Sequence, residues 1–427
     1  MGRGRSLVRG TAVLLLMSAF EVGAETTALK VGGWIDLPAA VLRPAATVLV
    51  EDGRIREIGE VEIPPAARVV DLGSAVLLPG LYDVHTHLCI SADARGPTVE
   101  ASFERFFAHI LTRPTAYRAL VGAANARSML EAGFTTLRDL GNAGDFADVA
   151  VQRALREGLF PGPTLDVAGK ALATFGGQFL HSPEHPDLAR QDYAFADTRD
   201  EIRRAIRRNI HFGANWIKVI VDEMSYAYSE EDLKFIVEEA HSAGAKVAAH
   251  CGTDRGTRAA IEAGVDSLEH ATRATKETLQ EAAARGIVLV GTEHPAAVLK
   301  AAGLPEDFAE WRAGLLERRL QSALEAGVEM AFGSDLFMRV AGHDRGSAAL
   351  AMLDSWIGAG MTAPEILRAM ITTPARLLDD EEKRGRIAPG FEADLIATRA
   401  SPLDEISALR HVVFVMKRGE IIRAPQP

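Results

Sequence analysis

Hydrophobic and polar positions alternate in two different ways along the chain. Near both ends, short runs with a period of two flank turn signals, as where 47–50 and 55–58 enclose Asp52-Gly53. An Asp-Gly pair between two such runs is typical of a β-hairpin. The stretch 394–422 has the same character. Neither end is long enough to fold alone, so we expect both ends to pair into one small β-sandwich domain.

The middle of the chain follows a different pattern, in which short apolar runs alternate with helical ones. In 230–243 apolar residues stand at 233, 236, 237 and 240, which predicts a helix with one buried face. Several helical runs end in Ala-Gly, as at 263–264 and 326–327, where a left-handed helix cap is needed. The predicted strands end near His85, Leu137, Val167, Ile220, Ala249, Glu269, Val290 and Phe332.

Eight strands alternating with helices over about 250 residues predict an α/β fold, a (β/α)8 TIM-like barrel. A doubly wound open sheet is the alternative, but the chain has no G-x-G-x-x-G and no phosphate-loop motif. We therefore divide the chain into a signal peptide (1–24), a first part of the β-sandwich (25–78), the barrel (79–385) and a second part of the β-sandwich (386–427).

The first residues resemble an export signal. Arg3, Arg5 and Arg9 precede an apolar run at 11–20, and small residues follow at 22–24. The run is shorter than the roughly 20 residues that cross a membrane. We expect a periplasmic or secreted protein without a stable membrane anchor.

Composition narrows the range of partners. The 427 residues include 58 acidic and 47 basic side chains, a net charge of −11, which argues against nucleic acid or an anionic membrane as a partner. Hydrophobic residues make up 48%, as in ordinary globular proteins. Cys89 and Cys251 are too few for a disulfide framework. The composition favours a globular enzyme with a small-molecule substrate.

The first candidate metal ligands lie at the end of the first predicted barrel strand. His85 and His87 are two residues apart, and because a strand has a period of two, their side chains point to the same side. Two neutral imidazoles can share one divalent cation. Such a pair also occurs as two hydrogen-bonded core histidines, so it does not decide the function alone.

Other predicted strands also end in polar residues. His250, His270 and Asp335 follow apolar runs, and Lys218 interrupts the run 216–220. A buried ammonium is costly without a partner. Barrel active sites lie where the carboxyl ends of the strands meet, so we expect these residues to converge there with the two histidines.

The order of these motifs resembles the metal-dependent amidohydrolase superfamily, particularly its imidazolonepropionase-like and Xaa-Pro dipeptidase-like members. Some relatives of this kind hydrolyse ochratoxin-type amides of an aryl acid and an amino acid. The matching segments are PGLYDVHTH (79–87), GFTTLRD (133–139), WIK (216–218), VAAH (247–250), GVDSLEH (264–270), GSD (333–335) and GRIAPGFEADL (385–395).

This resemblance implies two divalent metal ions, which we expect to be zinc, although the ligand set permits other first-row metals. His85 and His87 would bind one ion. His250 and His270 would bind the other. Lys218 would bridge both ions as a carbamate formed with carbon dioxide.

By the same resemblance, Asp335 would bind the first ion and act in catalysis. A metal-bridging hydroxide would attack the amide carbonyl, and Asp335 would pass its proton to the departing nitrogen. The substrate would be a dipeptide or N-acyl amino acid with a free carboxylate, including ochratoxin-type amides.

Five further residues are candidates for the substrate side. His181 lies in a Gly-Gly loop after the third predicted strand, and His294 follows the seventh. His343 and Arg345 lie on the loop after the predicted metal-binding aspartate and would hold a carboxylate. Tyr228 would donate to the developing oxyanion.

Two rival functions remain open at this point. One is hydrolysis of a cyclic amide, a lactone or an imidazolone. The other is a periplasmic binding protein that keeps the barrel without catalysis. Metal analysis separates it from an enzyme, because a binding protein should not copurify with about two equivalents of metal and show hydrolysis that a chelator abolishes. We also expect a homo-oligomer, because relatives commonly assemble.

Overall fold

The structure is a computed structural model that describes residues 26–141, 144–178, 186–223 and 226–425. The predicted signal peptide (1–24) and His181 therefore lie outside the described residues. Within the described ranges, no helix combines the length and the apolar character that crossing a membrane requires.

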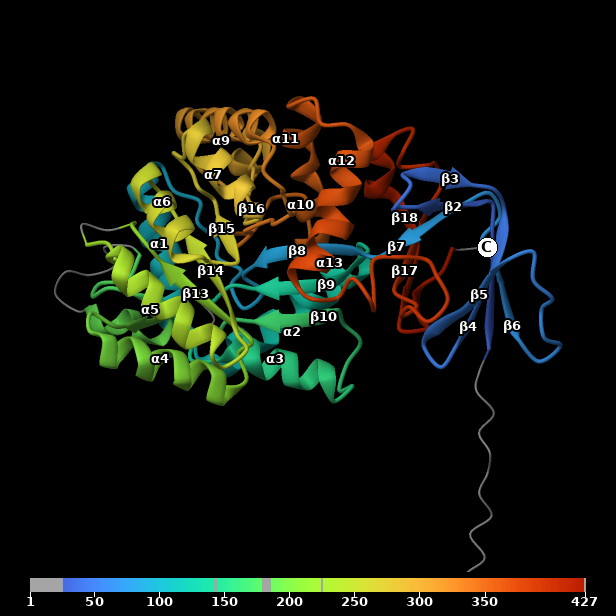
Figure 1. Ribbon diagram of the computed structural model, residues 1–427, viewed down its shortest axis with the longest axis horizontal. Coiled ribbons are helices and arrows are strands. Elements are labelled where there is room, and N and C mark those ends of the chain that lie inside the picture. The colour runs from blue at the N-terminus through green and yellow to red at the C-terminus, as the bar shows by residue number, and fades with distance from the viewer. Residues whose placement is uncertain (1–25, 142–143, 179–185, 224–225, 426–427) are drawn as a thin grey trace, which may run out of the picture.

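Strands from both ends of the chain form one sheet, of order β19-β18-β17-β7-β2-β3. The predicted pairing of the two ends is present here, because β17 runs antiparallel to β7, with Leu395 opposite Pro79. Figure 1 shows these blue and red segments side by side. The strands of this sheet are β2 (Gly33–Asp36), β3 (Val41–Arg43), β7 (Val76–Pro79), β17 (Leu395–Thr398), β18 (Val412–Lys417) and β19 (Glu420–Arg423).

A second sheet, of order β5-β4-β1-β6, comes from the N-terminal part of the described chain. Side chains of both sheets share one apolar cluster, in which Leu29 and Val48 meet Leu395 and Phe414. This common core holds the two ends together. The strands of the second sheet are β1 (Thr27–Val31), β4 (Ala46–Glu51), β5 (Arg54–Gly59) and β6 (Arg68–Asp71).

The middle of the chain contains strands that pair only in parallel within the described residues. They form the sheets β10-β9-β8 and β12-β11-β13-β14-β15-β16. Most of their side chains are buried, as is typical of parallel strands. These strands are β8 (Leu81–Thr86), β9 (Phe134–Asp139), β10 (Thr164–Val167), β11 (Ala171–Ala173), β12 (Tyr193–Phe195), β13 (Trp216–Ile220), β14 (Lys246–His250), β15 (Ser267–Glu269) and β16 (Val288–Val290).

Backbone hydrogen bonds link these two parallel sheets at both sides. The amide of Asn215 donates to Val167 O at 3.1 Å, which connects the segment before β13 to β10. On the other side, Ala331 N donates to Leu289 O and Val84 N to Phe332 O, each at 2.9 Å. The prediction of a strand at 330–332 is wrong, because this segment forms an isolated bridge and too few bonds for a ladder.

Helices alternate with the parallel strands and lie around them (Figure 1). The predicted buried face of α5 is confirmed, and α6 and α9 end at Gly264 and Gly327, whose φ angles of 80° and 69° suit glycine. The helices are α1 (Val99–Thr112), α2 (Thr115–Glu131), α3 (Ala147–Arg156), α4 (Arg199–Phe212), α5 (Glu230–His241), α6 (Asp254–Ala263), α7 (Lys276–Ala284), α8 (Ala296–Ala301), α9 (Glu306–Ala326), α10 (Arg345–Ala351), α11 (Leu353–Gly358), α12 (Ala363–Leu367) and α13 (Thr373–Leu377).

Candidate metal centre

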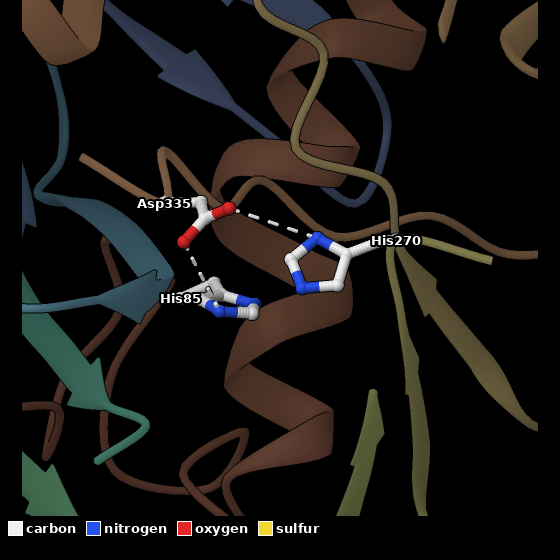
Figure 2. A group of neighbouring side chains, drawn as sticks. All are labelled: His85, His270 and Asp335. Atoms are coloured by element: carbon white, nitrogen blue, oxygen red, sulfur yellow. Dashed lines mark ion pairs between the residues drawn. The ribbon is translucent and has the colours of Figure 1, made fainter. Parts of the chain in front are cut away.

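Polar side chains from distant parts of the chain meet where the parallel strands end. His85, His270 and Asp335 each offer a ligand atom within 4.8 Å of the others (Figure 2). One carboxylate oxygen of Asp335 lies 3.6 Å from His85 Nε2 and 3.0 Å from His87 Nε2. The other oxygen lies 3.7 Å from His270 Nδ1. The aspartate therefore stands between imidazoles of two different strands.

The remaining two predicted ligands lie against this group. Lys218 Nζ is 3.3 Å from His85 Nε2. The ring of His250 is 4.5 Å from the ring of His270, centroid to centroid. The structure thus brings together all six side chains predicted to bind metal.

One ring nitrogen of His85 and one of His87 are held by a neighbouring acceptor. His85 Nδ1 donates to a carboxylate oxygen of Glu269 at 2.6 Å. His87 Nδ1 donates to the carbonyl of Gly141 at 2.9 Å, because a carbonyl can only accept. Both rings therefore turn Nε2 toward Asp335.

The other two histidines also have a ring nitrogen beside a neighbouring polar group. His250 Nε2 lies 2.7 Å from a carboxylate oxygen of Glu223, and His270 Nδ1 lies 2.8 Å from the hydroxyl of Thr292. For His270 this is the same nitrogen that faces Asp335, and Gln178 Nε2 lies 3.4 Å from His250 Nδ1. Both rings are thus held by polar neighbours within the group of candidate ligands.

Burial keeps the imidazoles of His85 and His270 neutral. Burial, together with a smaller contribution from the nearby Lys218 ammonium, lowers the pKa of His85 to about 3. Burial also lowers the pKa of His270 well below its ordinary value. Neutral imidazoles beside a carboxylate are the donor set of a divalent metal, so the residues present fit a metal ion.

Lys218 is buried in an unusual setting. Its side chain makes no ion pair with any residue in the described ranges, and the residue is only 3% exposed. Burial lowers its pKa to about 8, although the carboxylates of Glu269 and Asp335 oppose this shift. About one tenth of the amine is therefore neutral and nucleophilic at pH 7.

Sequence reasoning missed Glu269 and Arg138, which support the centre. Arg138 donates to Glu269 at 2.8 Å, and both side chains are fully buried. Burial alone would raise the pKa of Glu269, but Arg138 and His85 outweigh it and hold the pKa at about 2. The available signal was a charged residue inside a predicted strand, the same signal that singled out Lys218.

A cavity of about 320 Å³ opens beside the centre. One part of its wall is polar and consists of Glu223, His250, His270, His294 and Asp335. The rest of the wall is mostly apolar and comes from α8, α9 and the segment after Asp335. Its apolar residues include Val298, Leu299, Leu304, Phe308, Trp311, Phe337 and Met338.

Two residues predicted to hold a carboxylate lie elsewhere. His343 is exposed and lines other cavities, not this one. Arg345 is buried, and its guanidinium donates to the carbonyls of Leu336 and Ile90. The prediction that Arg345 holds a substrate carboxylate is therefore wrong, because its donors already bind backbone carbonyls, including one next to Asp335.

The hydroxyl of Tyr228 also has a hydrogen-bond partner within the protein. Its buried hydroxyl donates to Ala196 O at 2.8 Å, so a role as oxyanion donor stays a prediction that requires this bond to break. His294, in contrast, lines the cavity as expected. The cavity also contains two arginines that sequence reasoning missed, Arg273 and Arg312.

Comparisons with known proteins agree with this geometry. The sequence profile of the amidohydrolase family matches residues 76–423. Ochratoxinase from Aspergillus niger is 30% identical over 388 residues, which are 82% of this chain and 76% of that protein. Its crystal structure matches with a TM-score of 0.77 and 26% identity, covering 94% of this chain and 96% of that one.

Two further relatives belong to the same group. The crystal structure of a Xaa-Pro dipeptidase with methionine in its active site matches with a TM-score of 0.80 and 26% identity, covering 93% of this chain and 99% of that one. Imidazolonepropionase from Kosmotoga olearia is 23% identical over 411 residues, 89% of this chain and 91% of that protein.

Proposed function

The chain belongs to the amidohydrolase family and is a hydrolase, and from this premise we propose that it cleaves an amide bond at a centre of two divalent metal ions. The substrate is a dipeptide or an N-acyl amino acid with a free carboxylate. The observation that carries the proposal is the convergence of four oriented imidazoles, one buried lysine and one aspartate.

The proposed architecture is a closed (β/α)8 barrel, with a β-sandwich built from both chain ends. The parallel pairing and the backbone bonds on both sides of the two parallel sheets support it. In such a barrel the carboxyl ends of all strands face one mouth, which explains why residues far apart in sequence meet there.

The donor set supports zinc ions. When bound, two divalent ions would polarise the amide carbonyl and lower the pKa of a water molecule. The residues proposed to hold them are His85, His87, Lys218, His250, His270 and Asp335.

The protein's own side chains supply a metal ligand, transfer a proton and orient the histidine rings. The neutral amine of Lys218 adds carbon dioxide and releases a proton to solvent, which leaves a carbamate anion that would serve as an oxygen ligand in place of the costly buried ammonium. Asp335 accepts a proton at its carboxylate and delivers it to the departing nitrogen. Glu269, Glu223, Thr292 and Gly141 hold the four rings in place.

The names of the relatives favour this substrate class. Ochratoxinase and a Xaa-Pro dipeptidase are both similar over most of the chain, so we include ochratoxin-type amides among the candidates. The imidazolonepropionase relative is less similar in sequence, and we therefore do not propose cyclic amides.

The test is a panel of dipeptides and N-acyl amino acids, assayed with and without a chelator. We expect about two metal ions per chain and hydrolysis that is lost on chelation and restored by zinc. Hydrolysis that is unchanged in metal-free protein would exclude the proposal.

A further inference from the structure

Helix α9 presents two arginines whose surroundings differ. Arg319 is fully buried and donates to the carboxylate of Glu293 and to the carbonyl of Gly291, each at 2.6 Å. Arg312, two turns earlier, lines the cavity beside the metal centre together with Asp335. The first arginine therefore has its partners within the protein, and the second faces the substrate space.

Arg312 lacks such partners. It is half-buried, and among the described residues its guanidinium makes no hydrogen bond and no ion pair. Burial lowers its pKa, while the negative charges of Asp335 and Glu223 oppose that shift. A desolvated cation without a partner is costly, and an anionic ligand in the cavity would offset that cost.

The wall around Arg312 indicates what else the ligand carries. Leu299 and Leu304 are buried and pack with Phe308 and Met338 into one apolar cluster. Trp311, next to Arg312, is 51% exposed. An apolar surface beside cationic side chains suits a molecule with a hydrophobic body and a carboxylate.

We propose that Arg312 binds the free carboxylate of the substrate and thereby selects amides of hydrophobic α-amino acids. Arg273, an exposed residue on the same cavity, adds a second positive charge near this carboxylate. The planar guanidinium can hold both carboxylate oxygens at once. This inference rests on the proposed function and replaces Arg345 as the expected carboxylate anchor.

The main experiment compares two substrates that differ only in the carboxylate. N-benzoyl-L-phenylalanine carries it, and N-benzoyl-2-phenylethylamine lacks it. We expect the wild-type protein to prefer the first by about 100-fold in kcat/KM, and Arg312→Met to reduce this preference to a few-fold, mainly through KM. Arg312→Lys, which keeps the charge without the planar fork, should give an intermediate preference.

Arg318→Met is the matched control, because Arg318 is an exposed arginine on the same helix that does not line the cavity. It should leave the preference at the wild-type value. Equal losses on both substrates in Arg312→Met would overturn the proposal, because they would reveal a merely structural role.

A binding measurement separates this inference from the proposed function. L-Phenylalanine is titrated calorimetrically into the zinc-loaded wild-type and Arg312→Met proteins, and we expect about 10-fold or greater weakening in the variant. If neither benzoyl compound is hydrolysed but this weakening occurs, the proposed function fails and the anchor stands. If amide hydrolysis is chelator-sensitive but both proteins bind equally, the anchor is wrong and the proposed function stands.

Discussion

The candidate metal centre and the cavity wall beside it differ in how their side chains are held. At the centre, His85 lies on a strand, is fully buried and is fixed by Glu269. On the wall, Arg312 and Trp311 lie on a helix, are partly open to solvent and, in the case of Arg312, have no internal partner among the described residues. The strands and their buried partners fix the positions of the centre's side chains, whereas the wall leaves Arg312 open to a ligand.

The largest expected effect comes from removing the lysine of the centre. Lys218→Ala should lose metal and lower kcat/KM by about 1,000-fold or more, because the centre loses a ligand shared by both proposed ions. Metal analysis and steady-state kinetics measure this. A short carboxylic acid such as propionate should partly restore activity by supplying the missing oxygens.

Lys246→Ala is the matched control for this substitution. Lys246 also lies on a parallel strand, but it pairs with Asp379 and the carbonyl of Leu377 instead of reaching the centre. Its loss should leave the metal content unchanged. Full turnover in Lys218→Ala would exclude the bridging role.

The next effect concerns a residue that orients a ligand without binding metal. Glu269→Gln should weaken zinc binding by about 10–100-fold, because the ring of His85 loses its charged acceptor. It should also lower the free energy of unfolding by up to about 3–5 kcal/mol, since the buried Arg138 loses its charged partner. Zinc competition and thermal unfolding measure the two effects, and unchanged zinc affinity would limit Glu269 to a structural role.

A smaller effect follows from the pKa of Lys218, about 8. Only the neutral amine adds carbon dioxide, and its fraction rises from about one tenth at pH 7 to about nine tenths at pH 9. At constant dissolved carbon dioxide, carbamate formation in metal-free protein should therefore rise with pH through this window. Carbon-13 NMR with labelled bicarbonate measures it, and a signal that fell with pH would contradict this assignment.

The smallest effect is expected from a substitution in the cavity wall. Trp311→Ala should raise KM about 3-fold for an N-acyl phenylalanine, because a half-exposed aromatic ring contributes little binding energy. The same variant should leave KM for an N-acyl glycine nearly unchanged. A large loss of kcat on both substrates would show that the wall is not independent of the centre.

The sequence by itself determined the six residues of the centre. Each interrupts or follows an apolar run that forms a buried strand or a segment bonded to one, and parallel strands bring these ends together. The hairpins at the two chain ends could also be predicted from the sequence, because turn signals and a hydrophobic period of two are local properties. Among the predicted barrel strands, only the segment 330–332 does not form a strand, since too few backbone bonds form there.

Tertiary structure alone decided what surrounds these residues. Arg312 and Arg345 look alike as basic residues near helix starts or loops, yet one faces the cavity and the other holds the backbone of Leu336 and Ile90. Glu269 became a support for His85 only once β15 lay close enough to β8. The reason is physical: the type of a residue gives its chemistry, but its partner depends on how elements distant in the chain pack.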